Sequence, residues 1–152
     1  MVMVFALLIG MVAGLRAFIA PAAVSIAARY WLLGVAGTPL AFLGYRWTPW
    51  IFVALALAEL VGDLLPATPS RKVPVQFGTR ILMGALAGGA IGGAAMFYPG
   101  VAAGAAGAII GTLGGAAARA WLAAAFKNDR PAALIEDIVA IGGAWLIVCC
   151  PA

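Results

Sequence analysis

Five long runs of apolar residues constrain this chain more than any other feature of its sequence. The runs cover about 1–20, 47–65, 80–98, 101–126 and 132–148. Each is close to the length of about 20 residues with which an α-helix crosses the apolar core of a bilayer. Because 66% of the 152 residues are apolar and only 9% are charged, a soluble fold would lack the polar residues needed to cover its surface. The sequence therefore predicts an all-α integral membrane protein, with a single transmembrane domain over residues 1–152.

The segment 22–44, between the first two runs, is apolar but irregular. It contains Arg29, Gly34, Gly37 and Pro39. These residues favour a short helix and a broken, interfacial or re-entrant segment over a straight span. We expect the first run to be a retained span that ends or bends at Pro21, because Arg16 comes late in the run and not ahead of it, as in a signal peptide. The predicted fold has about five transmembrane helices plus a broken or re-entrant segment after Pro21.

Basic residues in the connections predict the orientation. The connections 66–79 and 127–131 contain Arg71, Lys72, Lys127 and Arg130. The turn predicted at Tyr98-Pro99-Gly100 has no charge. Because short basic loops stay in the cytoplasm, we expect the N-terminus on the cytoplasmic side of a bacterial inner membrane and the C-terminus outside. The formal net charge of +4 is interpreted in the same way, and not as a sign of nucleic-acid binding.

Glycines recur every four residues in three of the predicted spans. They are Gly10 and Gly14, then Gly84, Gly88 and Gly92, and then Gly107, Gly111 and Gly115. Residues four apart share one face of a helix, and a face without side chains lets a neighbouring backbone approach closely. The sequence therefore predicts glycine-zipper packing and a homo-oligomer. Faces that slide or line a pore remain an alternative interpretation of the same glycines.

Charged residues inside the predicted spans are the candidate functional residues. They are Glu59 and Asp63, Glu136 and Asp137, and Arg119. An isolated charge inside a bilayer costs at least about 2.5 to 3.5 kcal/mol, so these side chains should pair with one another or face a water-filled cavity. If Arg119 and Arg80 compensate two carboxylates, two remain that need a cation or a proton. A structural salt network, completed by Arg71 and Lys72, explains the same residues, and both interpretations stay open.

Arg16 is predicted to stand alone near the outer end of the first span. There it would bond to carbonyls of the broken segment or extend to the interface. A short internal similarity links Gly14-Leu15-Arg16-Ala17-Phe18 with Ala117-Ala118-Arg119-Ala120-Trp121. The two copies lie in the first and the fourth predicted span, so they would run in opposite directions, as in inverted-repeat transporters. An inverted repeat is therefore one interpretation of the fold.

The residue inventory argues against an enzyme. The chain has no histidine, and its only serines are Ser25 and Ser70, so a Ser-His-Asp or Cys-His triad cannot form. The adjacent cysteines, Cys149 and Cys150, are a poor zinc chelate and provide no disulfide framework. We expect no catalytic residue and no cofactor, and the sequence assigns no metal ligand.

Three blocks of sequence carry a family resemblance. They are Gly14-Leu15-Arg16-Ala17-Phe18 with Pro21, then Glu59-Leu60-Val61-Gly62-Asp63 with Pro66-Ala67-Thr68-Pro69-Ser70-Arg71, and then Leu134-Ile135-Glu136-Asp137 with Ala140-Ile141-Gly142-Gly143. In these blocks the chain resembles a bacterial integral-membrane family catalogued as domain of unknown function four-one-two-six. The resemblance extends over nearly the whole chain, and the middle block is the most specific. It implies the architecture but no activity, and the matched blocks contain the candidate acids.

We expect the chain to transport a small ion or solute, with proton or cation coupling as one form. The predicted binding residues are Glu59, Asp63, Arg119, Glu136, Asp137 and Arg16, with Thr68, Ser70, Arg71 and Arg80 in and beside the loop. The expected partners are the lipid bilayer, further copies of the chain and the transported species. The alternative is a non-transporting scaffold, assembly subunit or lipid-interacting module.

Overall fold

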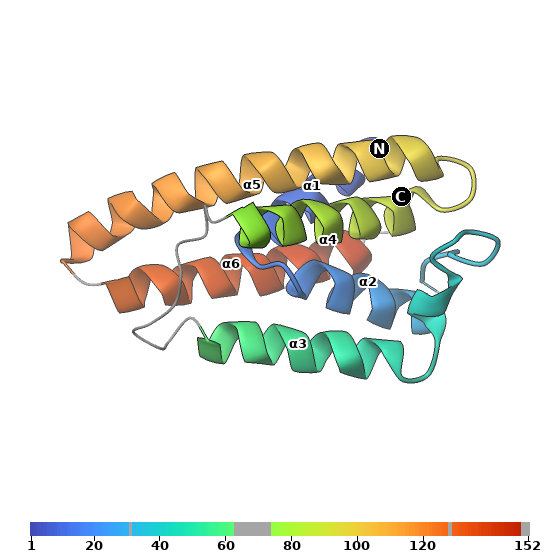
Figure 1. Cartoon of the computed structure of the whole chain (residues 1–152), viewed down its shortest axis with the longest axis horizontal. Coiled ribbons are helices and arrows are strands. Elements are labelled where there is room, and N and C mark those ends of the chain that lie inside the picture. The colour runs from blue at the N-terminus through green and yellow to red at the C-terminus, as the bar shows by residue number, and fades with distance from the viewer. Residues whose placement is uncertain (31, 63–73, 128, 150–152) are drawn as a thin grey trace.

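The structure is a computed structural model that describes residues 1–30, 32–62, 74–127 and 129–149. Regular structure in these residues is helical, without a strand, as the sequence predicts. The elements are α1 (Val2–Leu15), α2 (Ile19–Arg29), the 3-10 helix η1 (Ala41–Gly44), α3 (Thr48–Gly62), α4 (Pro74–Gly92), α5 (Phe97–Phe126) and α6 (Asp129–Cys149). The helices lie roughly along one axis, with α5 extending along one side of the bundle and α3 along the opposite side (Figure 1).

Helices α1 and α2 form a hairpin that turns back inside the bundle. Its 14 residues make α1 about 21 Å long, short of the roughly 30 Å of a bilayer core. One cavity of about 210 Å³ is lined by Val2 and Leu33, so the start of α1 and the segment after α2 meet at one end of the molecule. The tip of the hairpin, residues 16–18, therefore lies between the two ends of the bundle (Figure 1).

The boundary predicted at Pro21 is wrong. Helix α1 ends at Leu15, Arg16 is extended, and Pro21 lies in the first turn of α2. Proline is tolerated there because the first turn of a helix has no intrahelical partner for its N–H groups. The predicted first span is consequently a helix of 14 residues followed by a chain reversal, and the break lies within the predicted span and not after Pro21.

The turn predicted at Tyr98-Pro99-Gly100 is also wrong. Helix α4 begins at Pro74 and ends at Gly92, and the turn into α5 follows at once, with Gly93 at a φ of +57°. Glycine adopts this left-handed conformation without the steric cost of a Cβ. Tyr98, Pro99 and Gly100 form part of the first turn of α5.

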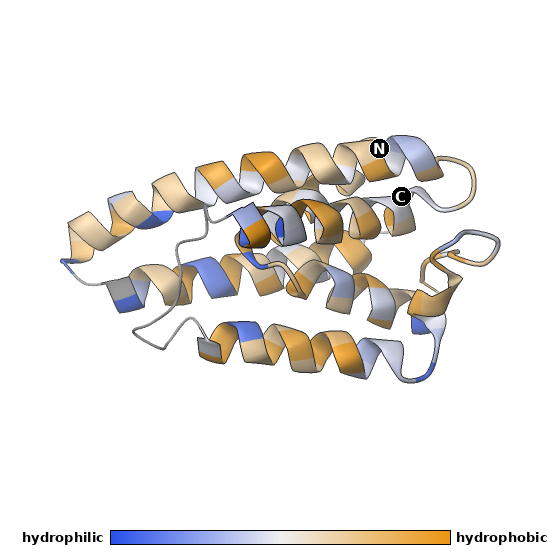
Figure 2. Ribbon diagram, in the orientation of Figure 1, coloured by the Kyte–Doolittle hydropathy of each residue, from blue (hydrophilic) through white to orange (hydrophobic). Residues whose placement is uncertain are grey.

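The remaining boundaries agree more closely with the sequence. Helix α3 covers the predicted run 47–65 as far as it is described, and α6 covers 132–148 and extends beyond it at both ends. Two described helices, Phe97–Phe126 and Arg130–Cys149, are long and apolar enough to cross a membrane by length and composition. Hydrophobic residues predominate along most helices, and hydrophilic ones gather near helix ends and at the hairpin tip (Figure 2).

Glycines allow the backbones of α1, α4 and α5 to approach one another. A Cβ at Gly88 would overlap the carbonyl oxygen of Gly100 in α5, and a Cβ at Gly104 would overlap that of Gly84. On the same face of α5, since residues seven apart lie almost in line along a helix, a Cβ at Gly111 would overlap the carbonyl oxygen of Met11 in α1. Residues larger than glycine at these positions would push the three helices apart.

Helices α1 and α5 run in the same direction, which contradicts the inverted-repeat interpretation. Gly10 lies against Gly104, and Gly14 lies against Ala108 and Thr112, so residue numbers rise together in the two helices. The two similar segments also differ in structure, because 14–18 spans a helix end and 117–121 lies inside α5. The chain reversal after Leu15 makes α1 and α2 two antiparallel helices in place of one predicted span, and thereby changes the direction of every later helix relative to α1.

The reversal also changes where the N-terminus lies. The sequence places it with the basic connection 127–131, but Val2 shares a cavity with Gly93 and Val148. The N-terminus and the end of α6 are therefore at one end of the bundle, and Lys127 is at the other (Figure 1).

Candidate functional site

The hairpin tip leaves the C-terminal end of α1 in the interior, where its last carbonyl groups need partners. Arg80 of α4 supplies them, with its Nη1 2.5 Å from the oxygen of Gly14 and 2.6 Å from that of Leu15. The hydroxyl of Thr112 in α5 lies 3.2 Å from the same Gly14 oxygen. A guanidinium suits this position because the C-terminal end of a helix carries a partial negative charge.

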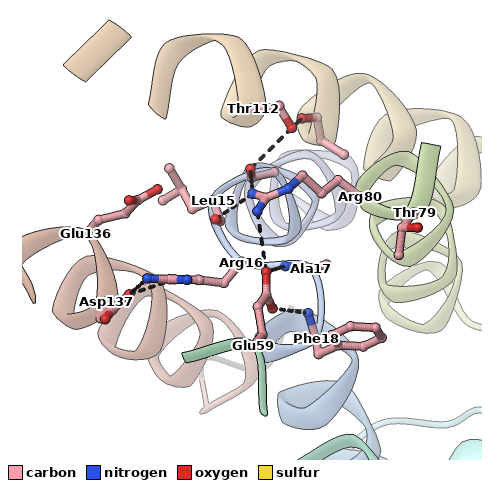
Figure 3. Close-up of polar contacts among 12 residues, drawn as sticks. Leu15, Arg16, Ala17, Phe18, Glu59, Thr79, Arg80, Thr112, Glu136 and Asp137 are labelled. Carbon is pink, nitrogen blue, oxygen red and sulfur yellow. Dashed lines mark hydrogen bonds and ion pairs between the residues drawn. The ribbon is translucent and has the colours of Figure 1, made fainter. Parts of the chain in front are cut away.

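Glu59 of α3 supplies the opposite charge at the N-terminal end of α2. Its Oε1 accepts the N–H of Ala17 at 3.0 Å and its Oε2 accepts the N–H of Phe18 at 3.1 Å. A carboxylate is favourable here because the N-terminal end of a helix is partially positive. Glu59 also lies 3.4 Å from Nη2 of Arg80, so one ion pair links both helix ends of the tip (Figure 3).

Arg16, at the tip itself, pairs with Asp137 of α6. Its Nε donates to Oδ1 of Asp137 at 2.6 Å, its Nη2 lies 2.5 Å from the same oxygen, and the residue is 1% exposed. The prediction that Arg16 stands alone near the outer end of a span, bonding to carbonyls or reaching the interface, is therefore wrong. The chain reversal after Leu15 places Arg16 in the middle of the bundle, beside α6 (Figure 3).

A third ion pair joins α5 and α6. Nη1 of Arg119 lies 3.5 Å from Oε2 of Glu136, which is buried. Gly115 borders this pair, since a Cβ there would be in ordinary van der Waals contact with Oε1 of Glu136, at 3.6 Å. Leu15 at the end of α1 packs against the same glycine, so the third pair adjoins the hairpin tip.

The described carboxylates of the predicted site are thus matched by arginines. Glu59, Asp137 and Glu136 each pair with one guanidinium, so the predicted excess of two carboxylates does not occur among the described residues. The other predicted site residues, Asp63, Thr68, Ser70 and Arg71, lie outside the described residues. No group of three or more metal-ligating side chains is found in the described parts of the chain.

A cavity of about 330 Å³ adjoins one side of the tip, between α3 and the start of α4. Its polar lining is formed by Glu59, Gln76, Thr79 and Arg80, together with Ala17 and Phe18 of the tip. The groups that bind the Glu59 carboxylate therefore border a space large enough for a small solute. Asp137 and Arg16 do not line it.

Some parts of the site are absent from the sequence prediction. Thr112 and the backbone groups of residues 14–18 bind the charged side chains, but the sequence points only to the charges. The available signal is Gly14 followed by Arg16 and Pro21, because a proline five residues after an arginine fits the first turn of a new helix.

A family model matches residues 3–152 and is described as Domain of unknown function (DUF4126). No curated protein and no solved structure matches the chain.

Proposed function

The chain belongs to this family, whose description names no activity, and we propose from the geometry of the hairpin tip that it transports a small ion or solute across a membrane. One observation carries the proposal. Two backbone N–H groups and the Arg80 guanidinium converge on one carboxylate, Glu59, at the edge of a cavity of about 330 Å³ between α3 and the start of α4. Broken helices whose ends hold charges in the middle of the membrane form the binding sites of many transporters.

The proposed membrane arrangement has four spans, α3 to α6, and one re-entrant hairpin, α1–α2, in place of five spans. Lys127 and Arg130 favour the cytoplasm for their end of the bundle. The N-terminus, at the other end, is then outside, which reverses the orientation expected from the sequence. The bacterial inner membrane remains the proposed location, and apolar faces that stay exposed would contact lipid or further copies of the chain.

Glu59 is the proposed coupling group. When Glu59 takes up a proton, its neutral carboxyl binds the N–H groups of Ala17 and Phe18 and the guanidinium of Arg80 less strongly than the carboxylate does. A small anion in the adjoining cavity can then bind these donors. Entry of one proton with one monovalent anion leaves the charge of the site unchanged, which avoids the cost of a net charge in an apolar interior. The proposed substrate is therefore a small anion or a carboxylate-bearing solute, carried together with a proton.

A non-transporting scaffold is the second candidate. The matching of three carboxylates by three arginines favours it, because a fully paired network can simply hold the re-entrant tip together. In that case the Glu59 carboxylate stays bound to the two N–H groups and to Arg80. The two candidates therefore differ in whether a small anion can replace this carboxylate at its donors.

Flux into proteoliposomes tests the proposal. We expect inward gradients of small anions, such as chloride and phosphate, to acidify a pH dye trapped inside, and we expect empty liposomes to show no such change. The same measurement with gradients of small cations tests for cation-coupled transport. Absence of flux for every ion, together with constant co-purification of one partner protein, would favour the scaffold.

A further inference from the structure

The bundle has a basic and aromatic surface at the end that carries the N-terminus. Arg29, the last residue of α2, and Arg46, shortly before α3, are both exposed and line one cavity of about 320 Å³. Tyr30 and Trp50 line the same cavity and are 72% and 68% exposed. Exposed tryptophan and tyrosine beside arginine are typical of the level at which lipid headgroups lie.

The two arginines lack a counter-charge in the described parts of the chain. The ion pairs formed there by Glu59, Glu136 and Asp137 use other arginines. The guanidinium of Arg46 lies over the ring of Trp47, 5.6 Å from its centroid. Two exposed guanidinium groups on one cavity match the charge and the hydrogen-bonding geometry of a phosphate.

An apolar groove continues from this basic cavity. The groove, of about 440 Å³, lies between α2, α3 and α6, and Ile26 and Val53 line both it and the basic cavity. None of its described lining residues is charged. Leu57 and Trp145, both more than half exposed, form part of its wall, so the groove is at the surface. Along α3 it extends from Val53 to Leu60, about 10 Å of helix.

We propose that this composite surface binds one anionic phospholipid, with its phosphate between Arg29 and Arg46 and one acyl chain in the groove. One ligand should contact both the basic cavity and the apolar groove. A free anion would not fill the groove, and a neutral apolar ligand would not pair with the arginines. A phospholipid is amphipathic in the required order, with its charge at the end of the bundle and its chain directed toward the middle. This proposal rests on the membrane placement given above but not on transport, so the two can fail separately.

The first test measures lipid binding to the full chain in mild detergent. Added phosphatidylglycerol should raise the thermal unfolding temperature and stay bound in native mass spectrometry, and phosphatidylcholine with the same acyl chains should do neither. Glycerol phosphate, which has the anionic headgroup but no acyl chain, should have no effect. Equal effects of both lipids would overturn the proposal in favour of an unspecific lipid layer, and an equal effect of glycerol phosphate would overturn it in favour of a free-anion site.

Two variants separate the halves of the surface. Arg29→Gln with Arg46→Gln should weaken phosphatidylglycerol binding about tenfold or more, since each basic residue near an anionic lipid contributes about 1 kcal/mol. Gly142→Leu should block the acyl chain, because Gly142 lines the groove and a Cβ there meets nothing within 4 Å. The variant should fold normally for the same reason.

Matched controls lie elsewhere on the molecule. Lys127→Asn removes an exposed charge at the other end, and Gly114→Leu adds the same side chain at an equally open position in α5. Both should bind phosphatidylglycerol as the unaltered chain does. Binding unchanged in Gly142→Leu and in the double arginine variant would overturn the proposal. A loss of dimers in Gly142→Leu, with lipid binding unchanged, would instead identify the groove as an interface between copies.

Discussion

Arg16 and Asp137 lie 121 positions apart in the chain, yet Nε of Arg16 is 2.6 Å from Oδ1 of Asp137. This ion pair links the tip of the hairpin α1–α2 to α6. Arg80 of α4 binds the C-terminal end of α1, and Glu59 of α3 binds the N–H groups before α2, so the tip is also linked to α4 and α3. A helix break in an apolar interior requires such partners, because each unsatisfied backbone group there costs several kcal/mol.

The Arg16–Asp137 pair should show strong energetic coupling. Asp137→Leu leaves the buried charge of Arg16 without this carboxylate and should lower the free energy of unfolding by about 3 to 5 kcal/mol. Arg16→Met leaves the carboxylate of Asp137, which is 21% exposed, without this guanidinium and should lower the free energy of unfolding by less. The double variant should recover most of this loss, because it buries no charge. Unfolding in detergent measures all three, with Lys127→Asn as an exposed-charge control. Additive losses in the double variant would show that the pair does not hold the tip.

Two glycines should respond oppositely to alanine. Gly88→Ala should destabilise the chain by about 1 to 3 kcal/mol, because the new Cβ overlaps the carbonyl of Gly100. Gly114→Ala meets nothing within 4 Å and should be neutral or stabilising by up to about 1 kcal/mol, because alanine restricts the unfolded chain. Thermal unfolding measures the stability of both variants. Equal changes in the unfolding temperature would be inconsistent with the described packing of α4 on α5.

Removal of two buried hydroxyl groups, those of Thr112 and Ser25, should have different effects on the free energy of unfolding. Thr112→Val should cost about 1 kcal/mol, because its hydroxyl lies 2.8 Å from the oxygen of Ala108 and 3.2 Å from that of Gly14. Ser25→Ala should be neutral or stabilising, because Oγ of Ser25 is buried without a hydrogen-bond partner among the described residues. A larger loss for Ser25→Ala than for Thr112→Val, measured by unfolding, would contradict the assigned hydrogen bonds.

The proposed re-entrant placement of the hairpin α1–α2 predicts from which side of the membrane single cysteines can be labelled. With Cys149 and Cys150 replaced by alanine, single cysteines at Gly34 and at Ala125 should react with an impermeant thiol reagent from opposite sides of the membrane. Ala125 should be on the cytoplasmic side, because Lys127 and Arg130 lie at that end. A cysteine at Val2 should react from the same side as one at Gly34. Reaction of Val2 and Ala125 from the same side would show that α1 crosses the bilayer completely.

A helix boundary can be predicted from the sequence when the residues that set it are neighbours in the chain. It is missed when they are distant in the chain. Helix α6 is predicted well because its run is apolar apart from Glu136 and Asp137, and because its start is marked by the charged and proline residues at 127–131. The end of α1 at Leu15 is missed because its partners are remote, with Arg80 65 positions further along the chain. The turn before α5 is misplaced because Pro99 fits the first turn of a helix as well as a loop.

Part of the candidate site could be predicted, because some of its residues are placed by their position along a single helix. The similar depth of Glu59, Glu136 and Arg119 follows from counting along straight helices, and these three residues do lie around the tip. The partner of Arg16 does not follow from counting, since it depends on the reversal of the chain. One missed helix end thus accounts for the wrong position of Arg16, the wrong end for the N-terminus and the rejected inverted repeat.

The most direct test of the proposed transport combines stability and flux in Glu59→Gln. The isosteric amide keeps the shape of Glu59 but cannot cycle between a carboxylate and its protonated form. Asp137→Asn is the matched control, because it removes a carboxylate of the same network that does not line the cavity. We predict that folded Glu59→Gln, reconstituted in proteoliposomes, shows anion-driven proton uptake no greater than empty liposomes, and that Asp137→Asn is less stable but retains uptake per folded molecule. Uptake at the unaltered rate by folded Glu59→Gln would contradict the assignment of Glu59 as the coupling group.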